Sequence, residues 1–184
     1  MKISTILKDG LKRTNKSQKE IGAVNHFSKS AVSNYFNKGH VPTDVAIDIA
    51  KQLDDYDTSN SVASEWFDIL KTFDGDRFEK DALSMDAFTD FENKQSHDTY
   101  VNDSIRKLIA DNRVDEDEEA SIDNFIDEEL DNVIMRMGRL VALCKLRHET
   151  LMTVFRNRME YYVDEHYMSK ENLSKSQRLT MNRK

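Results

Sequence analysis

The chain has 184 residues, and its 27 Lys and Arg against 34 Asp and Glu give a formal net charge of −7. It contains one Pro and five Gly but many Leu, Ile, Met, Glu and Lys, a composition that disfavours strand-rich folds and predicts helix over nearly the whole chain. A single cysteine excludes an intramolecular disulfide, and the sequence has neither a membrane-length apolar run nor a signal-type N-terminus, so we expect a cytoplasmic protein with no membrane contact.

Apolar residues recur three or four positions apart in four stretches near the N-terminus, which is the spacing of helices with one buried face. These stretches are residues 3–12, 17–24, 28–37 and 43–53. Ser17 lies three residues before Glu20, the spacing of a capping box, and Ser28 is placed to cap the third helix. Gly22 is small enough to let the third helix cross closely above the second.

The second and third stretches, joined by a tight turn, have the pattern of a helix-turn-helix. Val32 and either Tyr35 or Phe36 are the expected buried positions of the third helix. Its outward face then carries short or flexible polar side chains, which suit base edges and phosphates in DNA. A phosphate is also easily held in the first turn of the preceding helix. The predicted DNA-binding residues are Gln18, Ser28, Lys29, Ser30, Ser33, Asn34, Asn37 and Lys38.

This pattern resembles the Cro/repressor (XRE) family of helix-turn-helix regulators over roughly the first third of the chain. The resemblance is carried by Gln18, by Ile21 with Gly22, by Phe27 with Ser28, by Val32 with Ser33, and by residues 39–42. It implies a five-helix, lambda-repressor-like domain at residues 1–55 that binds double-stranded DNA. Family members make phosphate and base contacts at the positions matching Gln18, Lys29, Ser30 and Asn34. His26 stands where the family often has glycine, so a left-handed backbone there would be strained.

Charge is unevenly distributed along the sequence. Residues 1–53 carry nine Lys and Arg against four acidic residues, a net of +5, whereas the other 131 residues carry 18 against 30, a net of −12. A basic first third favours a DNA-facing domain. The alternatives are a helical hairpin inside an ordinary core and a helix-turn-helix that makes only protein contacts.

A second domain is predicted after a linker. Residues 54–61 are polar and turn-prone, and we expect them to form that linker. Residues 62–168 are predicted to form a helical oligomerisation or effector domain, a bundle with one long helix. Its expected helices include residues 62–73, 78–91 and 98–109. The polar, basic residues 169–184 are predicted to be disordered, and a phosphate-contacting arm is the alternative.

The longest apolar pattern, over residues 121–167, follows alternating steps of four and three and resembles a coiled-coil seam. The predicted oligomerisation residues are Leu130, Val133, Met137, Leu140 and Cys144. Further apolar residues widen the stripe, so packing within a monomeric bundle competes with a homodimer. The acidic beginning and basic remainder of the stretch also suit an antiparallel partner.

No catalytic chemistry is predicted. The acidic run at residues 115–119 lacks the alternating ligands, central Gly and terminal Glu of a calcium loop, so no metal site is expected there. His148 and Glu149 do not form a zinc-protease motif, because the residue four positions after His148 is Met152. There is no glycine-rich phosphate loop and no Cys/His cluster, so neither an enzyme nor a cofactor is expected.

The leading hypothesis is therefore a sequence-specific transcriptional regulator, of phage or mobile-element repressor type, that acts as a homodimer. The alternative is a protein-interaction inhibitor or antitoxin-like protein, such as a phage-encoded anti-defence protein. In that case the acidic C-terminal domain would bind a protein partner, and the helix-turn-helix would serve autoregulation.

Overall fold

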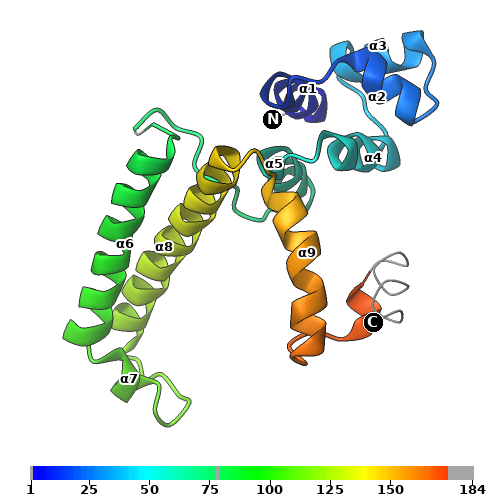
Figure 1. The fold of residues 1–184 in the computed structure, drawn as a ribbon. Helices are drawn as coiled ribbons and strands as arrows, with labels where there is room; N and C mark the ends of the chain where they lie inside the picture. Colours follow the sequence, from blue (N-terminus) through cyan, green and yellow to red (C-terminus); the bar gives the residue numbers. More distant parts are fainter. Residues whose placement is uncertain (1, 78, 174–184) are drawn as a thin grey trace. The chain divides into compact units, whose positions relative to one another are not determined.

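The computed structural model describes residues 2–77 and 79–173. Every regular element within these residues is helical, which confirms the predicted all-α fold class (Figure 1). The elements are α1 Ile3–Thr14, α2 Gln18–Val24, α3 Lys29–Asn37, α4 Thr43–Leu53, α5 Tyr56–Phe67, α6 Ala82–Asn102, α7 Ile105–Leu108, α8 Glu119–Leu146, α9 Leu151–Asp164 and a 3-10 turn, η1, at Lys170–Asn172.

The helices divide into two compact units. We call one the head unit; among the described residues it comprises 2–68 and 148–173, and it holds α1–α5, α9 and η1. The other, the hairpin unit, comprises residues 69–147 and holds α6, α7 and α8. The chain therefore leaves the head unit after α5 and returns to it with α9.

One hydrophobic core runs through α1–α5 of the head unit. Each helix buries part of the apolar stripe predicted from its spacing, although Val24, Ile47 and Phe67 are exposed. Partly buried side chains pack around the margin: Ile3, Phe27, Tyr35, Val41 and Trp66. The buried core residues are Ile6, Leu7, Leu11, Ile21, Val32, Phe36, Val45, Ala46, Ile49, Ala50, Leu53 and Val62. This shared core fixes α2 and α3 against the other helices.

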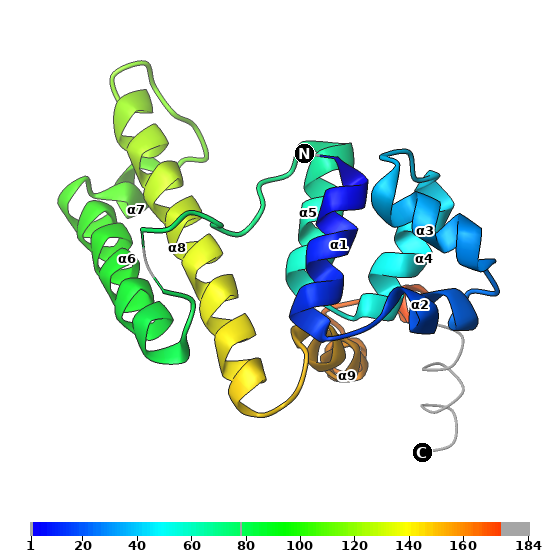
Figure 2. The same cartoon turned by 90° about the horizontal axis from the view of Figure 1, so that it is seen from above.

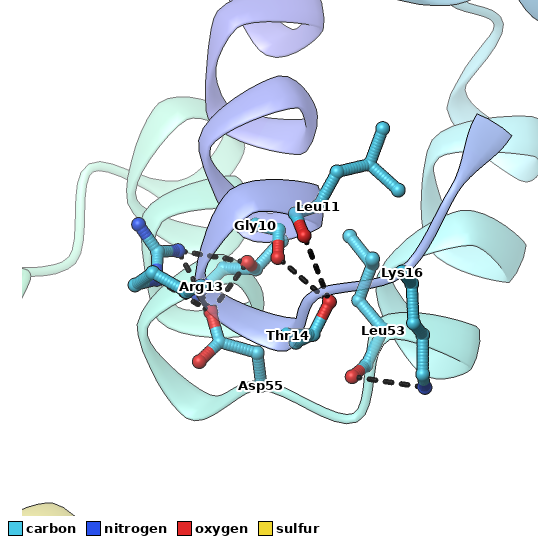
Figure 3. Close-up of polar contacts among 8 residues, drawn as sticks. Gly10, Leu11, Arg13, Thr14, Lys16, Leu53 and Asp55 are labelled. Carbon is cyan, nitrogen blue, oxygen red and sulfur yellow. Dashed lines mark hydrogen bonds and ion pairs between the residues drawn. The ribbon is translucent and has the colours of Figure 1, made fainter.

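The prediction of a linker at residues 54–61 is wrong, because these residues end α4 and begin α5. Asp54 closes α4 in the left-handed conformation, and Asp55 caps α5 by accepting the backbone N–H of Thr58 at 3.0 Å. Arg13 of α1 reaches the same Asp55 carboxylate at 2.7 Å, and Figure 3 shows this contact between α1 and the start of α5. Polar residues that resembled a loop are consecutive helix caps, so the predicted boundary at residue 55 cuts through the head unit.

A second correction concerns the predicted 62–168 domain, because the structure places α9 in the head unit. The carboxylate of Asp54 accepts the Thr150 hydroxyl at 2.6 Å and pairs with Arg156 at 2.8 Å. The rings of Tyr56 and Phe155 also meet, with their centroids 5.9 Å apart. These contacts attach α9 to the junction between α4 and α5, about 100 residues earlier in the chain.

The hairpin unit is built from two long antiparallel helices, and Figures 1 and 2 both show α6 and α8 side by side. Its cluster of buried residues is small, comprising Met85, Met135 and Ala142 with Phe73, Ala82 and Phe88 against it. Polar contacts also join the two helices: Arg139 of α8 pairs with Asp86 of α6 at 3.1 Å, and Arg136 donates to the Asn93 side chain at 2.9 Å. The two helices are therefore joined by a thin layer of apolar and polar contacts.

Several predicted helix limits differ from the structure. The predicted helix 62–73 ends early, because Asp68 is left-handed and closes α5. The predicted helices 78–91 and 98–109 are replaced by α6, which Asp81 caps by accepting two backbone N–H groups, and by the short α7. The continuous stretch 121–167 is broken at residues 147–150, where His148 has a φ of 56° and Thr150 caps α9.

The polar segment predicted as disordered is partly described. Residues 169–173 form η1 and its end, and the Leu173 side chain is buried. Residues 174–184, which carry most of the basic residues in the predicted tail, lie outside the described residues.

Candidate nucleic-acid interface

The α2 helix begins with the predicted capping box. The Ser17 hydroxyl accepts the Glu20 N–H at 3.2 Å, and the Glu20 carboxylate accepts the Ser17 N–H at 2.6 Å. These backbone and side-chain hydrogen bonds from Ser17 lower the pKa of Glu20 below its usual value. Glu20 is therefore held in the cap as a carboxylate, and Gln18 lies beside it in the first turn of α2.

Close packing sets the angle between α2 and α3. A Cβ atom on Gly22 would lie 2.9 Å from Cγ2 of Val32, so glycine permits the close approach that its position predicted. His26 has a φ of 56°, which costs an L-residue about 1–2 kcal/mol. The Phe27 ring then meets Tyr35 of α3 edge-on at a centroid distance of 5.5 Å. The turn thus holds α3 across α2 through one aromatic pair and one glycine contact.

The α3 helix presents the predicted polar face to solvent. Ser28 caps it by accepting the Ala31 N–H at 3.2 Å, while Val32 and Phe36 are buried and Tyr35 is half-buried. Seven of the eight predicted residues, all except the half-buried Gln18, are exposed. A shallow groove of about 730 Å³ separates this face from α2, and its lining includes Gln18, Lys29 and Ser33.

The two asparagines of the α3 face differ in their contacts. The Asn37 amide donates to the Ser33 carbonyl at 2.8 Å, so its donor is already engaged within the helix. Within the described part of the chain, the side chains of Asn34 and Lys29 make no hydrogen bond with the protein. The polar groups of Asn34 and Lys29 are therefore available to an external group.

The net charge of the two structural units differs from the charge division seen along the sequence. The basic excess of residues 1–53 does not extend over the described part of the head unit, because residues 2–68 and 148–173 together carry 12 Lys and Arg against 14 Asp and Glu. Two of those bases are also engaged internally: Arg13 pairs with Asp55, and Lys16 donates to the carbonyls of Gln52 and Leu53 at the end of α4. The hairpin unit carries 11 basic against 20 acidic residues, so it holds the acidity of the chain.

The predicted oligomerisation residues all lie on α8, and they are not equally accessible. Leu130, Val133 and Leu140 are exposed and Met137 is half-buried. Cys144 is buried within the chain, which fits the alternative of packing within a bundle and leaves little of its side chain for a partner. The spacing alone could not show this, because positions 140 and 144 continue the same four-residue step.

Comparisons of this chain with protein-family models, with curated proteins and with solved structures found no match. Over residues 2–77 and 79–173, no helix is both long and apolar enough to cross a membrane. In the same described part of the chain, no group of three or more His, Cys, Asp or Glu side chains is arranged to hold a metal ion.

Proposed function

We propose that the head unit binds double-stranded DNA with α3 in the major groove, and that the chain is a cytoplasmic, sequence-specific transcriptional regulator of the Cro/repressor type. The observation that carries the proposal is the exposed face of α3, formed by Lys, Ser and Asn side chains without a carboxylate. At 1.5 Å per residue, its nine residues span about 14 Å, a length comparable with the roughly 12 Å width of the groove.

The side chains on this face have distinct proposed roles. Lys29 and Asn34 read base edges, since Lys donates to guanine acceptors and Asn pairs with adenine through one donor and one acceptor. Gln18 at the start of α2 and Lys38 at the end of α3 hold phosphates on either side. Ser28 and Ser30, whose hydroxyl oxygens are 3.1 Å apart, add hydrogen bonds near the α3 N-terminus.

A single head reads few base pairs, so we propose that the chain acts as a homodimer. Two α3 helices placed one helical turn of DNA apart would read two half-sites and double the phosphate contacts.

The second candidate function, a protein-binding inhibitor or antitoxin-like role, is supported by the acidity and exposed apolar side chains of the hairpin unit.

A selection from random double-stranded DNA, followed by a mobility-shift assay of the intact chain, tests the DNA proposal, because the selection itself finds the preferred site. On the selected sequence, Asn34→Ala should weaken binding by about 1–3 kcal/mol with little change on random DNA. Lys38→Ala should weaken both and lower the salt slope by about one unit. Lys51→Ala, an exposed lysine on α4, is the matched control and should bind normally.

Failure of the intact chain to bind any double-stranded DNA at low salt would overturn the proposal. Selective binding that all three variants preserve would leave a DNA-binding protein but refute the assignment of α3 as the reading helix. If the chain binds no DNA but captures a protein through residues 69–147, the second candidate function replaces the first.

A further inference from the structure

One face of α8 is apolar, and no other helix of the hairpin unit packs against it in the described residues. Ile126, Leu130, Val133 and Leu140 are exposed there, and Met137 is half-buried between them. Their steps of four, three, four and three place them in one stripe. Met135 and Ala142, which pack toward α6, lie on the opposite side of the helix. We call this stripe the α8 seam; at 1.5 Å per residue it is about 21 Å long.

The charges along α8 divide sharply at its middle. From Glu119 to Asp131 the helix carries six acidic residues and no basic one, and from Asn132 to Leu146 it carries Arg136, Arg139 and Lys145 and no acidic one. A parallel pair of α8 helices would place the two acidic halves together. Arg139 and Arg136 are engaged with Asp86 and Asn93 of α6, so we assign the charge contact with a partner to the exposed Lys145. An antiparallel pair places Lys145 of each copy beside the acidic half of the other, which is favourable at both ends.

We propose that a second copy of this chain covers the α8 seam, with the two α8 helices antiparallel. In the register that places seam residues opposite seam residues, Val133 lies across from Met137 of the second copy and Leu130 from its Leu140. The two-fold axis then crosses the seam at the level of residue 135 along the helix, and Lys145 of one copy lies near Asp123 and Asp127 of the other. The inference locates the proposed homodimer interface and does not require that the chain bind DNA.

The first experiment measures the mass of the full chain by sedimentation over a range of concentrations. The wild type should form a dimer, and Val133→Glu should raise its dissociation constant more than about tenfold, because a tenfold change needs only about 1.4 kcal/mol. Val101→Glu on α6 is the matched control, since Val101 is 56% exposed and Val133 is 51% exposed. Circular dichroism should show the same helix content in all three proteins, and Leu140→Glu replaces Val133→Glu if the latter loses helix.

The second experiment tests the orientation. In a Cys144→Ala background, Leu130→Cys and Leu140→Cys proteins are oxidised alone and as a mixture. An antiparallel seam should cross-link the mixture, while each protein alone should stay uncross-linked, because its two cysteines lie about ten residues, or roughly 15 Å, apart along the seam.

Three results would overturn the inference. A wild-type chain that is monomeric at every concentration would show that no second copy covers the seam. Equal weakening by Val133→Glu and Val101→Glu would place the contact elsewhere. Efficient cross-linking of each single-cysteine protein with itself would indicate parallel helices. A dimer that shows none of these three results but binds no DNA would support this interface and would overturn the DNA proposal alone.

Discussion

Buried apolar side chains are distributed differently in the two units of this protein. Among the described residues, the head unit encloses a core of twelve buried residues drawn from α1 to α5, whereas the core cluster of the hairpin unit has three. The hairpin unit instead exposes large apolar side chains along both of its long helices, such as Leu83 and Phe91 on α6 and Val133 on α8. Stability of a helical layer comes mainly from the apolar face it buries. The head unit buries its apolar faces among its own helices, whereas the hairpin unit leaves part of its apolar surface exposed.

The largest expected effect comes from opening the core of the head unit. Ile49 is 0% exposed, so Ile49→Ala should lower the free energy of unfolding by about 2–5 kcal/mol. Leu83→Ala in the hairpin unit, where the side chain is 79% exposed, should change it by less than about 0.5 kcal/mol. Urea unfolding of both variants measures the contrast, and equal costs would mean that Leu83 is covered as fully as Ile49.

Next in size is the contact between α2 and α3 at Gly22. In Gly22→Ala the new Cβ would lie 2.9 Å from Val32, and this overpacking should cost about 1–3 kcal/mol. Gly75→Ala in the hairpin unit is the control, because a Cβ there meets nothing within 4 Å. Thermal unfolding should show a loss only for Gly22→Ala, and an unaffected Gly22→Ala protein would show that α2 and α3 can separate without cost.

A smaller loss is expected from the cap that joins α1 to α5. Asp55→Ala removes the N-cap of α5 and the partner of Arg13, and loss of such a cap costs about 0.5–2 kcal/mol. Asp81→Ala removes the N-cap of α6 in the hairpin unit, where the carboxylate is hydrogen-bonded to Leu83 and Ser84 of its own helix. Denaturant titration should rank Asp55→Ala as the more destabilised. The reverse order would show that the Arg13 contact adds nothing.

The smallest effect is the pH dependence of the attachment of α9 to the head unit. Partial burial acts to raise the pKa of Asp54, but hydrogen bonds from Arg156, Thr150 and Thr153 and the Arg156 charge outweigh it, so this pKa lies below its usual 3.8. Stability from this carboxylate is present above pH 3.8 and is lost as the pH falls through the lowered pKa.

Thermal melting of wild type and Asp54→Asn, from about pH 6 to about pH 3, checks the sign of this effect. The Asn variant should be less stable at the upper end and should lose less stability as the pH falls. Parallel curves for the two proteins would mean that Asp54 does not contribute to the acid sensitivity.

Much of the candidate interface was predictable because its determinants are local. A cap such as Ser17 or Ser28 acts on residues two or three positions away, and a helical stripe repeats within four. The starts of α2 and α3, the close approach at Gly22 and the buried positions of α3 therefore agree with the sequence-based expectations. The DNA-binding role of the α3 face stays a prediction.

Charge and polarity were less reliable guides at the end of the predicted first domain. The segment from Asp54 to Ser61 consists almost entirely of polar residues. Such a composition is typical of a loop, but it also suits the end of one helix followed directly by the N-cap of the next, which is what the structure has. The difference lies in Arg13, which is 42 residues away and pairs with Asp55. The basic excess of residues 1–53 does not mark out a basic domain either. The acidic residues between Asp54 and Asp68 belong to the same structural unit and offset that charge.

The sequence by itself determined that the chain is helical, where most of the head's helices begin, and which side chains α3 turns outward. Only the tertiary structure decided that α9 belongs to the head unit, that Cys144 is buried and that the α8 seam ends at Leu140. The physical reason is the range of the forces involved. Capping and periodicity act within one turn of helix, whereas Asp54 and Thr150, 96 residues apart, meet only when the chain has folded.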